Sequence, residues 1–138
     1  MSATHKNKTF ATWTALLTGA AGGHRIYLRG ARDRLAIAHC AGVAGTLAML
    51  VAMPEANAFW KLLPLTVSAI AGFIEALVIG VMPDEKFDAR YNAGSGRKSD
   101  SGGLLALGLV ATLLVGATVV IATMARLFDL LYTGGAYG

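Results

Sequence analysis

Residues 19–30 read Gly-Ala-Ala-Gly-Gly-His-Arg-Ile-Tyr-Leu-Arg-Gly and separate two apolar runs of the chain. A short apolar segment, residues 9–23, leads into this glycine-rich turn, and a cationic, aromatic stretch follows it. Glycine permits the tight turn, while tyrosine and arginine are residue types that gather at the interface between membrane and water. The pattern predicts a hairpin of two apolar helices whose turn lies among the lipid headgroups.

The composition is that of a small membrane protein. Of the 138 residues, 55% are hydrophobic and 14% are charged, and the mean hydropathy is +0.57. Soluble domains carry about 25% charged residues, so this chain has too few charges to cover a water-soluble globule. We therefore expect an all-α integral membrane protein, a small bundle of four hydrophobic helices. The single cysteine, Cys40, excludes an internal disulfide.

Four apolar segments are expected to form these helices: residues 9–23, 35–53, 62–82 and 104–132. The first would be about 22 Å long as a helix, which is short for a hydrocarbon core of ~30 Å. It is therefore either a short crossing or a re-entrant segment. We divide the chain into a membrane domain (1–92), a flexible linker (93–103) and a further membrane helix with a short tail (104–138). A short amphipathic helix is expected at 84–91.

The cations are unevenly distributed. Loops 24–34 and 84–103 hold eight of the twelve lysines and arginines. If all four segments cross, the positive-inside rule places both loops in the cytoplasm and both termini outside, with eight cations against four. If the first segment is re-entrant, Lys6 and Lys8 move inside and the count becomes ten against two. Both readings keep the basic loops cytoplasmic, and we expect Arg25–Arg34 to meet anionic lipid headgroups rather than nucleic acid.

Glu75 is the most informative single residue, because it lies within an apolar segment about two helical turns from Met82. An unpaired carboxylate at that depth costs several kcal/mol, so it should be paired, protonated or exposed to a wet cavity. The nearest candidate partners by depth are His39 and the Arg25–Arg34 cluster. Glu75 is therefore either a polar clasp between helices, which we favour, or a proton or cation site.

His39 could in principle bind haem or a metal ion, but a two-histidine site needs a partner at the same depth. His5 and His24 lie in or near loops in this reading, so we expect no metal, no cofactor and a packing role for His39. The sequence also has no recognisable catalytic triad or phosphate-binding loop. We therefore expect a protein that is not an enzyme.

Small residues recur every four positions on several helix faces. Such stripes let two helix backbones approach closely in lipid. They serve either the internal packing of the bundle or contact with another protein or a second copy. The expected helix-packing residues are Ser68, Gly72, Ala76, Gly80, Gly108, Thr112 and Gly116.

The turn also resembles the TM-two domain family, in which a membrane helix ends in a Gly-x-x-Gly-x-His/Asp-Arg-Phe-Tyr-Leu-Gly-like motif. Ile26 replaces the usual Phe, Arg29 departs from the usual residue, and residues 74–77 look like the family's acidic helix element. Residues 82–92 look like the tail of its bacterial branch, which implies a bacterial inner membrane. The family has no agreed biochemical activity. The motif residues are Gly19, Gly22, Gly23, His24, Arg25, Tyr27, Leu28 and Gly30.

These observations favour an accessory or scaffold subunit that packs against a larger membrane complex or against itself. The alternative is a small oligomeric channel or transporter with Glu75 facing the pathway. A haem-linked subunit using His39 is the least favoured interpretation.

Overall fold

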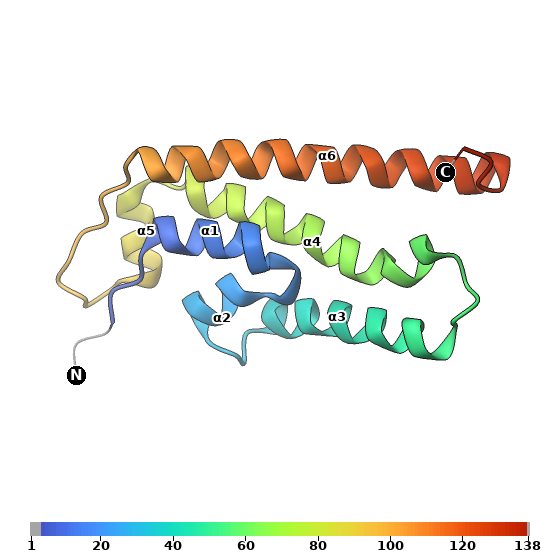
Figure 1. Ribbon diagram of the computed structural model, residues 1–138. Helices are drawn as coiled ribbons and strands as arrows, with labels where there is room; N and C mark the ends of the chain where they lie inside the picture. Colours follow the sequence, from blue (N-terminus) through green and yellow to red (C-terminus); the bar gives the residue numbers. More distant parts are fainter. Residues whose placement is uncertain (1–3, 138) are drawn as a thin grey trace.

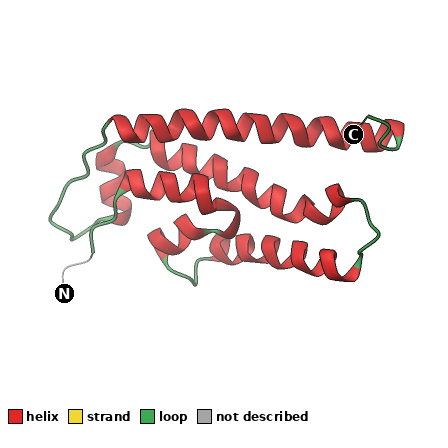
Figure 2. Ribbon diagram, viewed as in Figure 1, coloured by secondary structure: helices red, strands yellow, loops and turns green. Residues whose placement is uncertain are grey.

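The computed structural model describes residues 4–137, so the first three residues of the expected membrane domain and the last residue of the tail lie outside it. Figures 1 and 2 show a chain built of helices and connecting loops, with no strand among the described residues. The expected all-α class is confirmed. The elements are α1 (Lys8–Thr18), the 3-10 turn η1 (Gly19–Ala21), α2 (Gly23–Arg29), α3 (Arg34–Ala52), α4 (Ala58–Val81), α5 (Asp84–Tyr91) and α6 (Gly103–Thr133).

Three helices, α3, α4 and α6, are long and apolar enough to cross a membrane. The first two begin at side-chain caps: Asp33 accepts hydrogen bonds from the first amides of α3, and Asn57 does so for α4. Their apolar runs match the segments expected at 35–53, 62–82 and 104–132. The helix predicted at 84–91 is confirmed as α5.

The first apolar segment does not form a fourth long helix. α1 has 11 residues, about 16 Å, and is followed by η1 and by α2, which turns back toward the start of α1. Gly22 makes the reversal with φ +75°, a left-handed conformation that a glycine adopts without strain. The hairpin closes where the Asn7 amide donates to the Tyr27 hydroxyl at 2.8 Å. The first segment is therefore too short to span and folds back on itself at Gly22; we call residues 8–29 the hairpin.

α4 is the central helix, with the hairpin, α3 and α6 packed around it (Figure 1). The small-residue stripe of α4 is buried against these neighbours. A Cβ on Gly72 would lie 2.7 Å from the carbonyl carbon of Gly19, so the two backbones touch. α6 packs on α4 where Gly116 meets Phe73, and on α1 where Gly108 meets Trp13. The stripes therefore serve the internal packing of the bundle, the first of the two roles expected for them.

The N-terminus, α5 and the start of α6 are tied together at one end of the bundle. The Lys6 amide donates to Asn92 at 2.6 Å, and Lys8 pairs with Asp84 at 2.9 Å. Phe87 is fully buried in a small apolar core with Ala11, Leu28, Ile79 and Met82. Since the chain's beginning and α5 share one end, α3, α4 and α6 run alternately away from it, toward it and away again.

The stretch expected as a flexible linker, 93–103, contains no helix before Gly103. It is nevertheless fastened at two points. The Ser99 amide donates to Asp88 at 2.6 Å, and the Ser101 amide donates to Asp84 at 2.9 Å. Hydrogen bonds from Ser99 and Asn92 hold the pKa of Asp88 down, at about 2. Ser101 and Lys8 likewise lower the pKa of Asp84.

Candidate functional site

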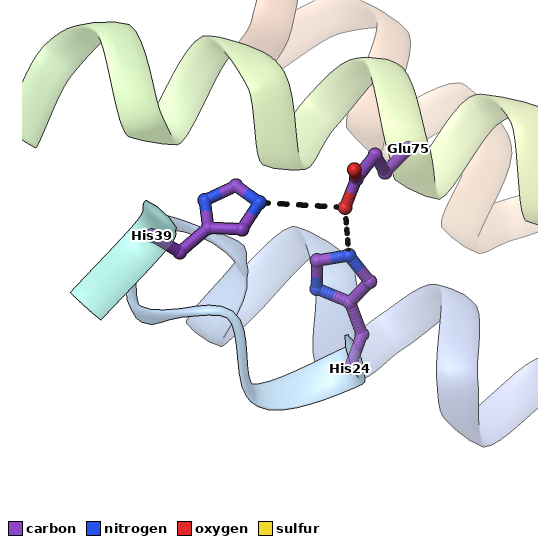
Figure 3. Close-up of side chains that lie close together, drawn as sticks. All are labelled: His24, His39 and Glu75. Atoms are coloured by element: carbon purple, nitrogen blue, oxygen red, sulfur yellow. Dashed lines mark hydrogen bonds and ion pairs between the residues drawn. The ribbon is translucent and has the colours of Figure 1, made fainter. Parts of the chain in front are cut away.

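A cluster of buried polar side chains lies where the hairpin meets α3 and α4 (Figure 3). His24 comes from α2, His39 from α3 and Glu75 from α4, and one nitrogen or oxygen atom of each lies within 4.8 Å of the others. His24 is fully buried, His39 is 5% exposed, and the side chain of Glu75 is 17% exposed. We call these three residues together with Arg25 the polar cluster.

Arg25 neutralises the carboxylate of Glu75. Its Nε donates to Oε2 of Glu75 at 2.9 Å, and a terminal nitrogen donates to Oε1. This bidentate geometry is the strongest form of arginine–carboxylate pairing. The hydrogen bond and the negative charge of Glu75 raise the pKa of Arg25, so the guanidinium stays charged. Arg25 also lies 3.8 Å from a second carboxylate, that of Asp33.

The protonation of His39 at one ring nitrogen follows from its neighbour Ser68. The Ser68 hydroxyl donates its proton to the carbonyl of Ala20 at 2.7 Å, and the same oxygen lies 2.7 Å from Nδ1 of His39. A serine hydroxyl has one proton, and a carbonyl can only accept. For both contacts to be hydrogen bonds, Nδ1 of His39 must donate to Ser68.

With the proton on Nδ1, the other ring nitrogen of His39, Nε2, faces Glu75. Its Nε2 lies 3.4 Å from Oε2 of Glu75. In neutral His39 the proton is on Nδ1, so Nε2 has a bare lone pair that faces a carboxylate oxygen. Two acceptors facing each other in a buried site repel, and a proton or another cation between them removes the repulsion.

His24 bonds to the same oxygen of Glu75 through its Nε2. Its Nδ1 is buried and has no hydrogen-bond partner among the described residues. Neutral His24 therefore donates from Nε2, since the buried Nδ1 then carries a lone pair rather than an unsatisfied N–H. The hairpin and α3 thus converge on one carboxylate of α4.

A groove of about 510 Å³ between α3 and α4 reaches the cluster. Most of its walls are apolar, including Leu35, Pro64 and Val67, and its polar wall consists of His39, Ser68 and Glu75. The cluster is therefore buried by side chains on the hairpin side and open to a small ligand on the α3–α4 side.

The structure brings together the partners predicted for Glu75, because both His39 and Arg25 contact it. His24, predicted to lie in or near a loop, lies in the first turn of α2 directly after the turn at Gly22, and it is fully buried. α2 begins at Gly23, and the reversal at Gly22 turns His24 inward against α4. Arg25 faces Glu75, whereas Arg32 and Arg34 of the same cluster are exposed.

The sequence did contain a signal for the buried position of His24. A first segment too short to cross must return, and a returning hairpin carries the residues after its turn into the bundle. The other motif residues have structural roles: Gly19 touches Gly72, Leu28 joins the apolar core, and the Tyr27 hydroxyl closes the hairpin. Gly30 adopts φ +90° at the end of α2.

Comparisons with protein-family models, with curated proteins and with solved structures found no match. The resemblance of residues 19–30 to the TM-two domain family therefore stays a prediction. The chain is helical, α3, α4 and α6 are long and apolar enough to cross a membrane, and the polar cluster lies between the hairpin, α3 and α4.

Proposed function

We propose that this chain is a non-enzymatic integral membrane protein of a bacterial inner membrane, and that it acts as an accessory subunit of a larger membrane complex or of a homo-oligomer. The proposal rests on the burial along α6: its first half packs against this chain, and its second half is left exposed. Its buried residues are Leu105, Gly108, Thr112 and Gly116, all in the first half. Beyond them, large apolar side chains such as Ile121 and Leu131 are exposed.

The small-residue stripe of α4 packs against the chain's own helices and does not face outward. The free surface is instead the outer side of α4 and α6, where a groove of about 310 Å³ runs between the two helices. Its walls are apolar and include Phe73, Leu113 and Val120. An apolar helix of a second subunit fits such a groove, since close packing drives helix association in lipid.

The distribution of charge supports a cytoplasmic location for the end that holds the hairpin and α5. With three crossings, this end carries ten of the twelve lysines and arginines, and the opposite end carries Lys61 and Arg126. The positive-inside rule then places the N-terminus and both basic loops in the cytoplasm. Twenty-two residues, 104–125, precede Arg126 in α6, about 33 Å and enough for one crossing.

The polar cluster has a structural role in this proposal. Both oxygens of Glu75 accept hydrogen bonds from the hairpin, which is too short to be held by spanning the membrane. The cluster is the clasp that fixes the hairpin against α4 and so completes the packing surface of the bundle.

Site-specific photo-cross-linking in intact cells tests the proposal. A photoreactive residue at Ile121 on α6, which is 69% exposed, should give a discrete protein adduct that co-purifies in mild detergent. The matched control is Val51 on α3, which is 84% exposed and should give lipid adducts alone. A monomer that yields lipid adducts at both positions would contradict an accessory role.

The groove that reaches Glu75 favours a second candidate, a small oligomeric channel or transporter subunit. Glu75 would face the pathway together with His39 and Ser68. Glu75→Gln should then abolish ion or proton flux in liposomes while the oligomer still assembles. Unchanged flux in that variant excludes the pathway role.

A further inference from the structure

We propose that His24, His39 and Glu75 bind a divalent transition-metal ion of the zinc type in the space between their facing atoms. This inference goes beyond the accessory role and stands on the cluster alone. Two imidazole nitrogens and one carboxylate oxygen are a ligand set that zinc, cobalt and nickel accept. The three residues come from three different helices, so a bound ion would join α2, α3 and α4.

The distance between the ligand atoms of His39 and Glu75 fits such an ion, whereas the ligand atoms of His24 and Glu75 are too close and would have to separate. Nε2 of His39 and Oε2 of Glu75 are 3.4 Å apart. Two ligands of a tetrahedral ion with bonds of 2.0–2.1 Å lie about 3.4 Å from each other. His24 is in direct hydrogen-bond contact with Oε2 of Glu75, so its ring would move back as the ion enters.

The hydrogen bonds around His39 prepare it as a ligand. Ser68 accepts from Nδ1 of His39 and donates to the carbonyl of Ala20, which holds the ring and its tautomer. Metal-binding histidines usually donate their second ring nitrogen in this way. The arrangement leaves the lone pair of Nε2 directed at Glu75, a repulsive contact that a cation relieves.

Arg25 is the competitor for the carboxylate. Its guanidinium occupies both oxygens of Glu75, so an ion can bind through Oε2 only if the Nε bond is released. Asp33 offers a second carboxylate 3.8 Å from Arg25, and it also caps α3. Binding of the ion would therefore shift Arg25 from Glu75 toward Asp33.

The groove between α3 and α4 provides both access and an open coordination position. It reaches His39 and Glu75 directly, with a volume of about 510 Å³. Three protein ligands with one free position are typical of zinc sites that also hold water or a small ligand.

The test uses the full chain in detergent micelles, stripped with a chelator and titrated with Co²⁺, whose absorption spectrum reports tetrahedral nitrogen and oxygen ligands. We expect one ion per chain, displaced by Zn²⁺. His24→Gln and His39→Gln should each weaken binding by at least tenfold. Ser68→Ala should weaken it by roughly tenfold to a hundredfold, because Nδ1 of His39 loses its hydrogen-bond acceptor. Arg25→Gln should strengthen it, because the competing cation is gone.

The matched control is His5→Gln, since His5 bonds to Ser95 outside the cluster and should leave binding unchanged. Helix content by circular dichroism identifies any variant that fails to fold, and Ser68→Ala retains all three ligands. Absence of stoichiometric Co²⁺ uptake overturns the proposal, as does uptake that His24→Gln and His39→Gln do not affect. A cluster whose histidines take up a proton but no ion also overturns it.

Discussion

The two sides of α4 are held by different forces. On the hairpin side, the contacts are polar and close: His24 and Arg25 bond to Glu75, and the backbones of Gly19 and Gly72 touch. On the α6 side, the contacts are steric: Gly80 receives Leu109, and Gly116 receives Phe73. Among the described residues, no side-chain hydrogen bond joins α4 to α6.

The difference follows from the lengths of the two partners. α6 is long and apolar enough to cross a membrane by itself, so packing has only to select its neighbour. The hairpin is too short to span, and its turn would expose polar backbone in lipid unless other groups satisfy it. The Ser68 hydroxyl donates to the backbone carbonyl of Ala20 in the turn. Glu75 accepts hydrogen bonds from α2, the helix after the turn.

The largest expected effect on stability comes from removing the carboxylate of Glu75, which holds the hairpin side of α4. Glu75→Ala leaves the charge of Arg25 and the ring of His24 without their partner. Breaking a buried ion pair from one side costs about 3–5 kcal/mol of unfolding free energy, and the partial exposure of Glu75 places the expected loss near the lower value. Titration with sodium dodecyl sulfate, followed by tryptophan fluorescence, measures this free energy.

The matched control is the double variant Glu75→Ala with Arg25→Ala. It removes both charges, so it should recover a large part of the loss seen in the single variant. If the single variant unfolds within about 1 kcal/mol of the original chain, the clasp does not hold the hairpin.

The sequence identified the helices better than it identified the site, and the reason is physical. Long apolar runs reveal candidate spanning helices through hydropathy alone, and the short helix expected at 84–91 is present as α5. The depth of His24 depends on where the hairpin reverses, which is a tertiary property. Counting residues from a segment end placed His39 and Glu75 at one level, but only the reversal at Gly22 adds His24.

The close packing between the hairpin and α4 can be tested by a glycine-to-alanine substitution, which adds one methyl group. A Cβ on Gly72 would lie 2.7 Å from a backbone atom of Gly19, which cannot move aside as a side chain does. Gly72→Ala should therefore cost about 1–3 kcal/mol of unfolding free energy by overpacking. The same titration in detergent measures it.

Substitutions at two other glycines serve as comparisons for Gly72→Ala. On the α6 side, a Cβ on Gly116 would meet the side chain of Phe73 at 3.2 Å, so Gly116→Ala should cost less than Gly72→Ala. In α3, a Cβ on Gly45 would meet Pro64 at an ordinary 3.6 Å, and Gly45→Ala should be neutral or stabilising because alanine favours the helix. Equal losses at Gly72 and Gly116 would remove the distinction between the two sides.

Among the described residues, one hydrogen bond connects the hairpin to α6 and provides a further test. The indole of Trp13 donates to the carbonyl of Leu104 at 3.1 Å. Trp13→Phe keeps an aromatic ring over Gly108 and removes this bond, so we expect a loss of about 1 kcal/mol. Thermal unfolding in detergent measures it, and Leu17→Ala on the exposed face of α1 is the control. A loss as large as that of Glu75→Ala would mean that α6 also depends on polar contacts.

The smallest expected effect concerns the hydrogen bonds by which Asp88 holds the stretch before α6. Hydrogen bonds from Ser99 and Asn92 keep the pKa of Asp88 at about 2, below its ordinary value of 3.8. Because the folded pKa is the lower one, this contribution to stability is complete above pH 3.8 and is lost as the pH falls toward 2. Hydrogen exchange of the Ser99 amide, which donates to Asp88, should be slower in the original chain than in Asp88→Asn at pH 5. The difference between the two proteins should close as the pH approaches 2, whereas a difference that persists at pH 2 would show that the carboxylate's charge does not hold this stretch.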